Sequence, residues 1–388
     1  MVSLDVFLAP LDGDNPSGAE LRNDPRFLAI ERLLEPGSRE ARTETPGTAP
    51  AVTSDVDWDA VLSQAEDLAG TGRDLRLLVV VTRALANVDG IDPEKGYLGY
   101  AGLASGLDMI ARNVTEFWDS LHPELRDSTS PREAGLRRLN ALMQLENDDH
   151  GLLGDLEMNA VIEARGLGIV TGADLAAGTL TENDVLREGP SGLGTAEEAK
   201  IVAAHEERVH KVEAVTRALA AEQPELFEAL SASRTAARAG LDALAEAVNG
   251  KLGLGPGEGL RFAELSKFLD RVGATLDAAR AHMAEEASAA APAAGAAASG
   301  SAPAAPHAAP SGAGFNGAGI NSREDVERAL DMIIAFYERT EPASPIPHLA
   351  RRMRRMVPMD FMELMEEIAP GGLKEFRSVA GVPEDKRK

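Results

Sequence analysis

The stretch Leu75–Val88, LRLLVVVTRALANV, decides how the fold is interpreted because it is apolar on most sides. Its length and composition suit a buried helix, although three successive valines also permit a buried strand, since β-branched side chains favour strands. We predict a helix, with the strand as the alternative.

The segments around this stretch show helical spacing of apolar residues. Asp24 followed by Pro25 is typical of a helix start, with an N-cap and a proline at the first helical position. Residues 38–54 are rich in Pro, Gly, Ser and Thr and predict a loop. Further helices are expected over the following ranges: 58–68, 98–118, 131–145 and, around a glycine-rich loop at 250–259, 195–287. The pattern predicts an all-α protein.

Composition supports a helical protein of more than one domain. The chain has 388 residues, which suffices for two or three cores, and only 4% of them are aromatic. The cores must therefore consist mainly of Leu, Ala, Val, Ile and Met, residues that mostly suit helices.

Charge and cysteine content exclude several classes of protein. A formal net charge of -24 repels a phosphate backbone, so we expect no nucleic-acid partner. The absence of cysteine removes disulfides, thiol nucleophiles and thiolate metal sites, and permits the reducing cytosol. No signal peptide or membrane-spanning run is recognisable, so we expect a soluble, cytoplasmic protein that does not insert into the membrane.

Residues 287–319 consist almost entirely of Ala, Pro, Gly and Ser, and predict a disordered linker. The linker divides an acidic part from a nearly neutral tail, which indicates two functional modules. We predict an N-terminal helical domain at 1–180, a helical middle domain at 181–286, the linker, and a C-terminal domain at 320–388.

The C-terminal domain is small and strongly amphipathic. Ser322 and Asp325 have the spacing of a capping box, and an apolar stripe containing Leu330, Ile333, Ile334 and Tyr337 follows. A domain of about 70 residues with short helices is marginally stable alone. The sequence therefore predicts that this domain associates with copies of itself.

An arginine cluster at residues 351–355 allows three interpretations, of which the overall charge disfavours one, contact with anionic lipid or nucleic acid. Two interpretations remain. The cluster forms either a solvated helix face or a set of ion pairs with acidic residues of a neighbouring subunit, such as Asp360 and Glu363.

No motif specifies a reaction, a cofactor or a metal. His205 and His210 are five residues apart, which is not the spacing that places two metal ligands on one helix face. The glycines at 253–259 do not form a phosphate-binding pattern. We predict no catalytic, cofactor-binding or metal-binding residues. Trp118, His122 and Pro123 allow two interpretations, a surface that binds a partner or core packing at a helix end.

Several motifs in order resemble the TssA (ImpA-type) family of type VI secretion system proteins, in its class with a shorter C-terminal domain. The motifs are NPSGAELRNDPRF at 15–27, Trp58, GRDLR at 72–76, FWD and HP within 117–123, RRLN at 137–140, SRED at 322–325, Tyr337, EPASPIP at 341–347 and MDF at 359–361.

The resemblance implies a non-catalytic structural protein with an ImpA-like N-terminal domain. Such proteins form homo-oligomeric rings through the C-terminal domain and associate with the baseplate, the inner tube and the contractile sheath. The protein would then lie in the cytoplasm, at the secretion apparatus on the inner membrane. The residues expected in the ring contact are Leu330, Ile333, Ile334, Tyr337, Pro342, Ser344, Pro345, Arg354 and Phe361.

Two other functional classes remain as alternatives. One is a soluble helical adaptor that acts as a monomer or dimer, and the other is an uncharacterised hydrolase, which would need a convergent polar pocket with shifted pKa values.

Overall fold

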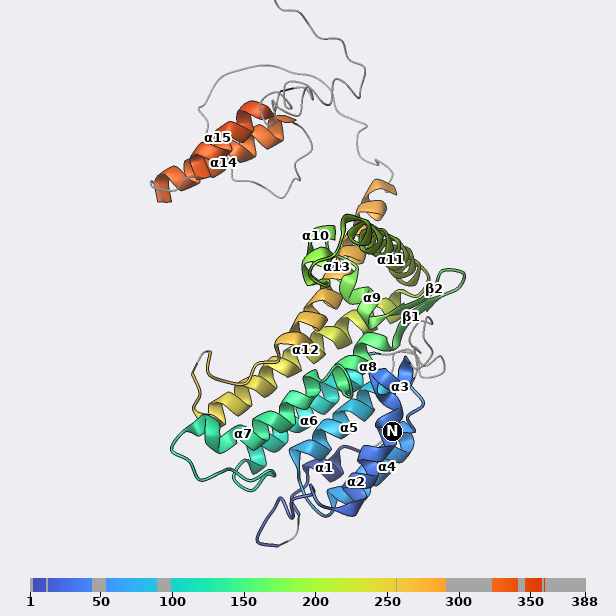
Figure 1. Cartoon of the computed structure of the whole chain (residues 1–388), viewed down its shortest axis with the longest axis vertical. Coiled ribbons are helices and arrows are strands. Elements are labelled where there is room, and N and C mark those ends of the chain that lie inside the picture. Colours follow the sequence, from blue (N-terminus) through green and yellow to red (C-terminus); the bar gives the residue numbers. More distant parts are fainter. Residues whose placement is uncertain are drawn as a thin grey trace, which may run out of the picture. The chain divides into compact units, whose positions relative to one another are not determined.

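The computed structural model describes residues 3–11, 13–43, 54–88, 99–255, 257–290, 323–340, 346–357 and 359. The chain divides into two compact units, Met1–Gly295 and Ala296–Lys388. Helices make up most of both units in the described residues, which confirms the predicted fold class (Figure 1).

The first unit contains helices and one antiparallel β-hairpin. The helices are α1 (Asp5–Leu8), α2 (Pro25–Leu33), η1 (Glu35–Gly37), α3 (Arg39–Arg42), α4 (Trp58–Ala69), α5 (Leu75–Val88), α6 (Ala101–Phe117), α7 (Pro131–Leu142), η2 (Met143–Glu146), α8 (Leu152–Met158), α9 (Gly172–Ala177), α10 (Glu182–Glu188), α11 (Thr195–Glu222), α12 (Pro224–Leu252) and α13 (Ala263–Ala290). The hairpin pairs β1 (Ala160–Ala164) with β2 (Gly168–Thr171). In the second unit the described helices are α14 (Arg323–Thr340) and α15 (Ile346–Met356).

The deciding stretch is helix α5, so the helical prediction is confirmed and the strand alternative is wrong. Side chains are buried on most sides of α5, including Leu75, Leu78 and Val81. The helix packs against α4 on one side and α6 on another. A helix surrounded in this way needs apolar residues around most of its circumference, which explains its composition.

The start of α2 follows the predicted cap. The Asp24 carboxylate accepts a hydrogen bond from the backbone N–H of Arg26 at 2.9 Å, with Pro25 at the first helical position. The loop predicted for residues 38–54 is wrong at its start, where Ser38 caps the short helix α3. The remainder of that loop, residues 44–53, lies outside the described residues.

One apolar core extends through the first unit. Helices α5, α6 and α12 lie side by side, and α13 packs against α12, as Figure 1 shows. The core contains residues from both the predicted N-terminal domain and the predicted middle domain, among them Leu107 and Leu244. The boundary near residue 180 stays a prediction.

Two features of the first unit differ from the sequence analysis. Helix α13 continues to Ala290, past the predicted start of the linker at residue 287. The β-hairpin at 160–171 was not predicted. No helix in the described part of the chain is long and apolar enough to cross a membrane.

Candidate functional site

Three of the signature segments meet in one network of backbone hydrogen bonds. The N–H of Arg73 donates to the carbonyl of Ser17 at 2.8 Å, and the N–H of Ala19 donates to the carbonyl of Thr71 at 3.0 Å. On the other side of the same strand-like segment, His122 N–H donates to the Arg73 carbonyl at 3.0 Å. The segments at 15–27, 72–76 and 117–123 are thereby joined.

Asp74 organises this network from a fully buried position. Its carboxylate accepts the N–H of Leu21 at 3.1 Å and the N–H of Arg76 at 3.0 Å, so it also caps the start of α5. The Arg76 guanidinium donates to the same carboxylate at 2.7 Å and to Glu20 at 2.6 Å. One buried carboxylate therefore fixes α5 relative to the N-terminal segment.

Gly18 and Gly72 are required where the first two segments cross. A Cβ atom on Gly72 would lie 1.9 Å from the carbonyl oxygen of Ala19. Gly18 has a φ of 60°, and a Cβ there would lie 2.4 Å from the carbonyl oxygen of Thr71. No other residue allows so close an approach of the two backbones.

Arg138 joins the fourth signature segment to the network. Its side chain is 1% exposed and donates to the backbone carbonyls of Trp118 at 2.6 Å, Pro123 at 2.8 Å and Leu121. These carbonyls follow the C-terminal end of α6, where a cation is favourable. The guanidinium also lies 4.4 Å from the centre of the Trp118 ring. Burial lowers the pKa of Arg138 to about 10, so the side chain stays charged at neutral pH.

The predicted partner-binding residues lie inside this network. Trp118 is 7% exposed, His122 is 4% exposed and Pro123 is buried. The His122 ring nitrogen Nε2 lies 2.9 Å from the Gly18 carbonyl oxygen. Such burial is what the core-packing alternative requires. A role in partner binding stays a prediction for these residues, and in this position they would act by holding the surrounding surface in shape.

The predicted ring-contact residues are only partly described. On α14, Leu330 is buried, Ile333 is 40% exposed, and Ile334 and Tyr337 are half-buried. Arg354 is exposed and pairs with Asp331 of the same chain at 3.0 Å. The other members lie outside the described residues: Pro342, Ser344, Pro345 and Phe361. The structure brings the described members together on one helical hairpin, because α14 packs against α15.

A second buried polar cluster, centred on Asp155, was not found from the sequence. The Asp155 carboxylate accepts two bonds from Arg83, at 2.6 and 3.1 Å, and one from Asn87 at 3.1 Å. Arg42 lies 3.6 Å away and also donates to Asn159 at 2.7 Å. The cluster ties α3, α5 and α8 together. Its carboxylate is occupied by donors of the fold, which is the arrangement of a structural ion pair.

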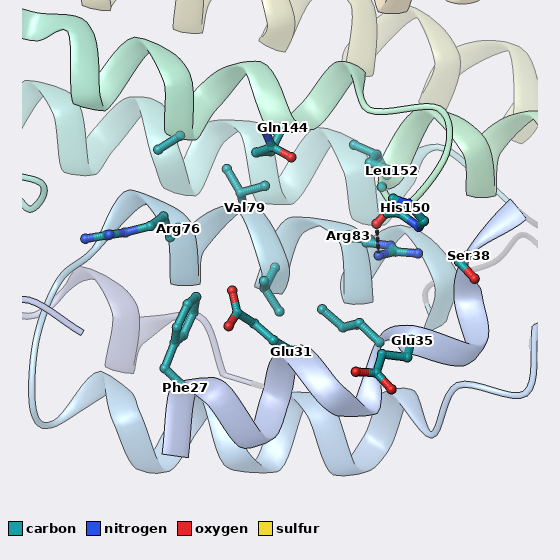
Figure 2. A pocket seen from close by; sticks show the side chains of 14 residues that line it. Phe27, Glu31, Glu35, Ser38, Arg76, Val79, Arg83, Gln144, His150 and Leu152 are labelled. Carbon is teal, nitrogen blue, oxygen red and sulfur yellow. Dashed lines mark hydrogen bonds between the residues drawn. The ribbon is translucent and has the colours of Figure 1, made fainter. Parts of the chain in front are cut away.

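A cleft of about 410 Å³ lies between α2, α5 and the segment from η2 to α8, and we call it the α2 cleft (Figure 2). Its lining residues are Phe27, Glu31, Leu34, Glu35, Ser38, Arg76, Val79, Val80, Arg83, Ala141, Gln144, His150, Gly151 and Leu152. Figure 2 shows Glu31 beside Phe27, with Arg76 and Arg83 on either side of Val79. Its size is typical of a binding site.

Neither a metal-ligand cluster nor an unbonded buried carboxylate occurs in the described residues. These residues contain no group of three or more His, Asp or Glu side chains that could hold a metal ion. The buried ionisable groups Asp74, Asp155 and Arg138 are bonded to groups of the fold itself. The described residues thus form a helical protein with two units, with a cleft in the first unit and buried carboxylates that are bonded to the fold itself.

Comparison with known proteins finds one family model and one relative that match this chain. Residues 8–147 match the family described as ImpA, N-terminal, type VI secretion system. The chain is 29% identical to the type VI secretion system component TssA1 of Pseudomonas aeruginosa, over 98% of this chain and 99% of that protein. Residues 8–147 therefore carry a region that matches the ImpA N-terminal family, and the whole chain is similar to a TssA component of the type VI secretion system.

A solved structure also matches this chain. It is the N-terminal domain, including the conserved ImpA_N region, of the TssA component of the type VI secretion system from Burkholderia cenocepacia. The match covers 72% of this chain and 94% of that chain, with 22% identity and a TM-score of 0.49.

Proposed function

We propose that this chain is a non-catalytic structural component that assembles as a homo-oligomeric ring and supports baseplate and tube or sheath assembly in the type VI secretion system. The observation that carries the proposal is the similarity to TssA1, which extends over 98% of the chain and so includes the tail as well as the ImpA domain.

The tail hairpin supports self-association because it exposes large apolar side chains. Leu349 is 58% exposed and Met353 is 57% exposed, and they lie one turn apart on α15. On α14, Met332 is 43% exposed and Phe336 is 49% exposed. Burying such side chains stabilises an assembly by roughly 25 cal/mol per Å² of apolar surface. A second copy of the hairpin offers the apolar surface that this requires.

The proposed organisation follows the sequence. Residues 320–388 form the ring, the part of the linker that follows α13 acts as a tether, and the helical domain at 1–180 contacts the partners, with the helical middle domain at 181–286 between that domain and the tether. A ring carries many copies of the N-terminal domain, which raises the effective concentration of that domain near a common target. The protein would work in the cytoplasm, attached to the apparatus at the inner membrane.

The proposal is tested by measuring the mass of the full chain with mass photometry. We expect particles of many subunits for the wild type, and monomers or dimers for the double variant Leu349→Ser, Met353→Ser. Both side chains are more than half exposed, so the substitutions remove interface surface with little effect on folding. The control is Leu167→Ser in the hairpin of the first unit, where Leu167 is 44% exposed.

A wild-type chain that is a monomer or dimer at micromolar concentration contradicts the ring and favours the adaptor alternative. A double variant that keeps the wild-type mass would instead show that this face of the hairpin is not the contact.

A further inference from the structure

The α2 cleft has an apolar floor beneath an acidic rim. Phe27, Val79 and Leu152 are buried at its base, and Leu34 and Val80 are half-buried along its sides. Glu31 and Glu35, both exposed, lie on the α2 and η1 side (Figure 2). A cleft with this lining accepts an apolar group and presents charge to whatever surrounds that group.

The arginines of the cleft are already paired with carboxylates of the fold. Arg76 pairs with Asp74 at 2.7 Å and with Glu20 at 2.6 Å. Arg83 pairs with Asp155 at 2.6 Å, and it donates to the His150 carbonyl at 2.6 Å. Neither guanidinium is therefore available as the main counter-ion for an incoming acidic group.

The glutamates of the rim differ from the arginines in this respect. Among the residues that the structure describes, Glu31 and Glu35 have no basic side chain within ion-pair distance. They are four residues apart across the junction of α2 and η1, and both residues line the same cleft. The uncompensated charge of the cleft is negative, and the complementary partner is basic.

We propose that the α2 cleft is a docking site for a basic amphipathic helix of another protein. The helix would insert Leu or Met side chains over Phe27, Val80 and Leu152, and place Lys or Arg side chains against Glu31 and Glu35. Amphipathic helices bind apolar grooves in this way, with anchors at three- and four-residue spacing. The inference rests on the proposed function only in taking the partner to be a protein of the assembly.

The test uses fluorescence anisotropy with a fluorescein-labelled probe peptide, LRRLLRRLLRRL, and the full chain. The charge variant is Glu31→Gln with Glu35→Gln, and the filling variant is Gln144→Trp, because Gln144 is exposed at the edge of the cleft. The matched control is Glu198→Gln with Glu207→Gln on α11, two exposed glutamates far from α2 in the sequence.

We expect the charge variant to bind the probe with about fivefold lower affinity, since two solvent-exposed ion pairs are lost. The filling variant should lower the affinity for the probe about tenfold or more, because its tryptophan occupies the apolar floor of the cleft. The control variant should change the affinity less than twofold, although it removes the same total charge. The affinity should also fall as salt is added.

Either of two results overturns the proposal. One is an equal loss of affinity in the control and the charge variant, which would show that the probe responds to net charge alone. The other is full displacement of the probe by an equal concentration of spermidine, which would make the cleft a site for small cations. Particle mass, measured on the same samples, separates this question from ring formation, because the cleft variants leave the tail unchanged.

Discussion

Replacing Arg138 by Met should destabilise the first unit by about 3 kcal/mol. The substitution keeps most of the side-chain volume but leaves the buried carbonyls of Trp118, Leu121 and Pro123 without their donor. Each unsatisfied buried group costs about 1–3 kcal/mol, so three such carbonyls would together cost about 3–9 kcal/mol. Removing a buried cation recovers several kcal/mol of desolvation, so the net loss falls near the lower end.

The assay is urea denaturation of the full chain followed by circular dichroism, comparing midpoints and slopes with the wild type. Arg137→Met is the matched control, because Arg137 precedes Arg138 on α7 and is exposed. We expect the control to stay within about 0.5 kcal/mol of the wild type. If Arg138→Met and Arg137→Met unfold at the same urea concentration, Arg138 does not hold the network together.

Two further predictions concern a backbone crossing and an ion pair. Gly72→Ala should lower the free energy of unfolding by about 2 kcal/mol, because its Cβ would overlap a carbonyl, whereas Gly70→Ala, with open space around it, should change the free energy little. In thermal or urea unfolding, equal effects at the two positions would contradict the close approach. Arg271 and Lys267 hold the pKa of Glu188 at about 2, so its contribution is present above pH 4.5 and is lost as pH falls from 4.5 towards 2. Glu188→Gln should therefore be less stable than the wild type by under about 1 kcal/mol at pH 7, and a difference that persists unchanged at pH 2.5 would refute this.

Much of the helical architecture follows from local patterns. Asp24 and Pro25 start α2, and the composition of Leu75–Val88 matches its buried position as α5. These signals are readable because caps and apolar periodicity act within a few residues. The β-hairpin was missed although it left a trace, two short β-branched runs around Gly166 and Gly168, which have positive φ values of 81° and 91°.

Local sequence patterns could not predict the two buried polar clusters. Arg83 and Asp155 are far apart in the sequence, and nothing near either residue indicates the other. Arg137 and Arg138 are adjacent and identical in type, yet only Arg138 is buried. Which of two arginines enters a core depends on the carbonyls that the folded chain presents, so sequence spacing cannot distinguish them. The α2 cleft also combines residues from four separate segments, which no single motif contains.

The packing of α12 against α6 has a practical consequence for dissecting this protein. The family match ends at residue 147, but Leu107 of α6 lies against Gly240 of α12, and Leu252 lies against Gly135 of α7. A truncated chain that stops at residue 147 would lack α12, so the apolar face of α6 that α12 covers would be exposed to solvent. Exposed apolar surfaces of this kind promote aggregation. Chimeras and expression fragments should therefore be cut after α13, where the shared interior ends.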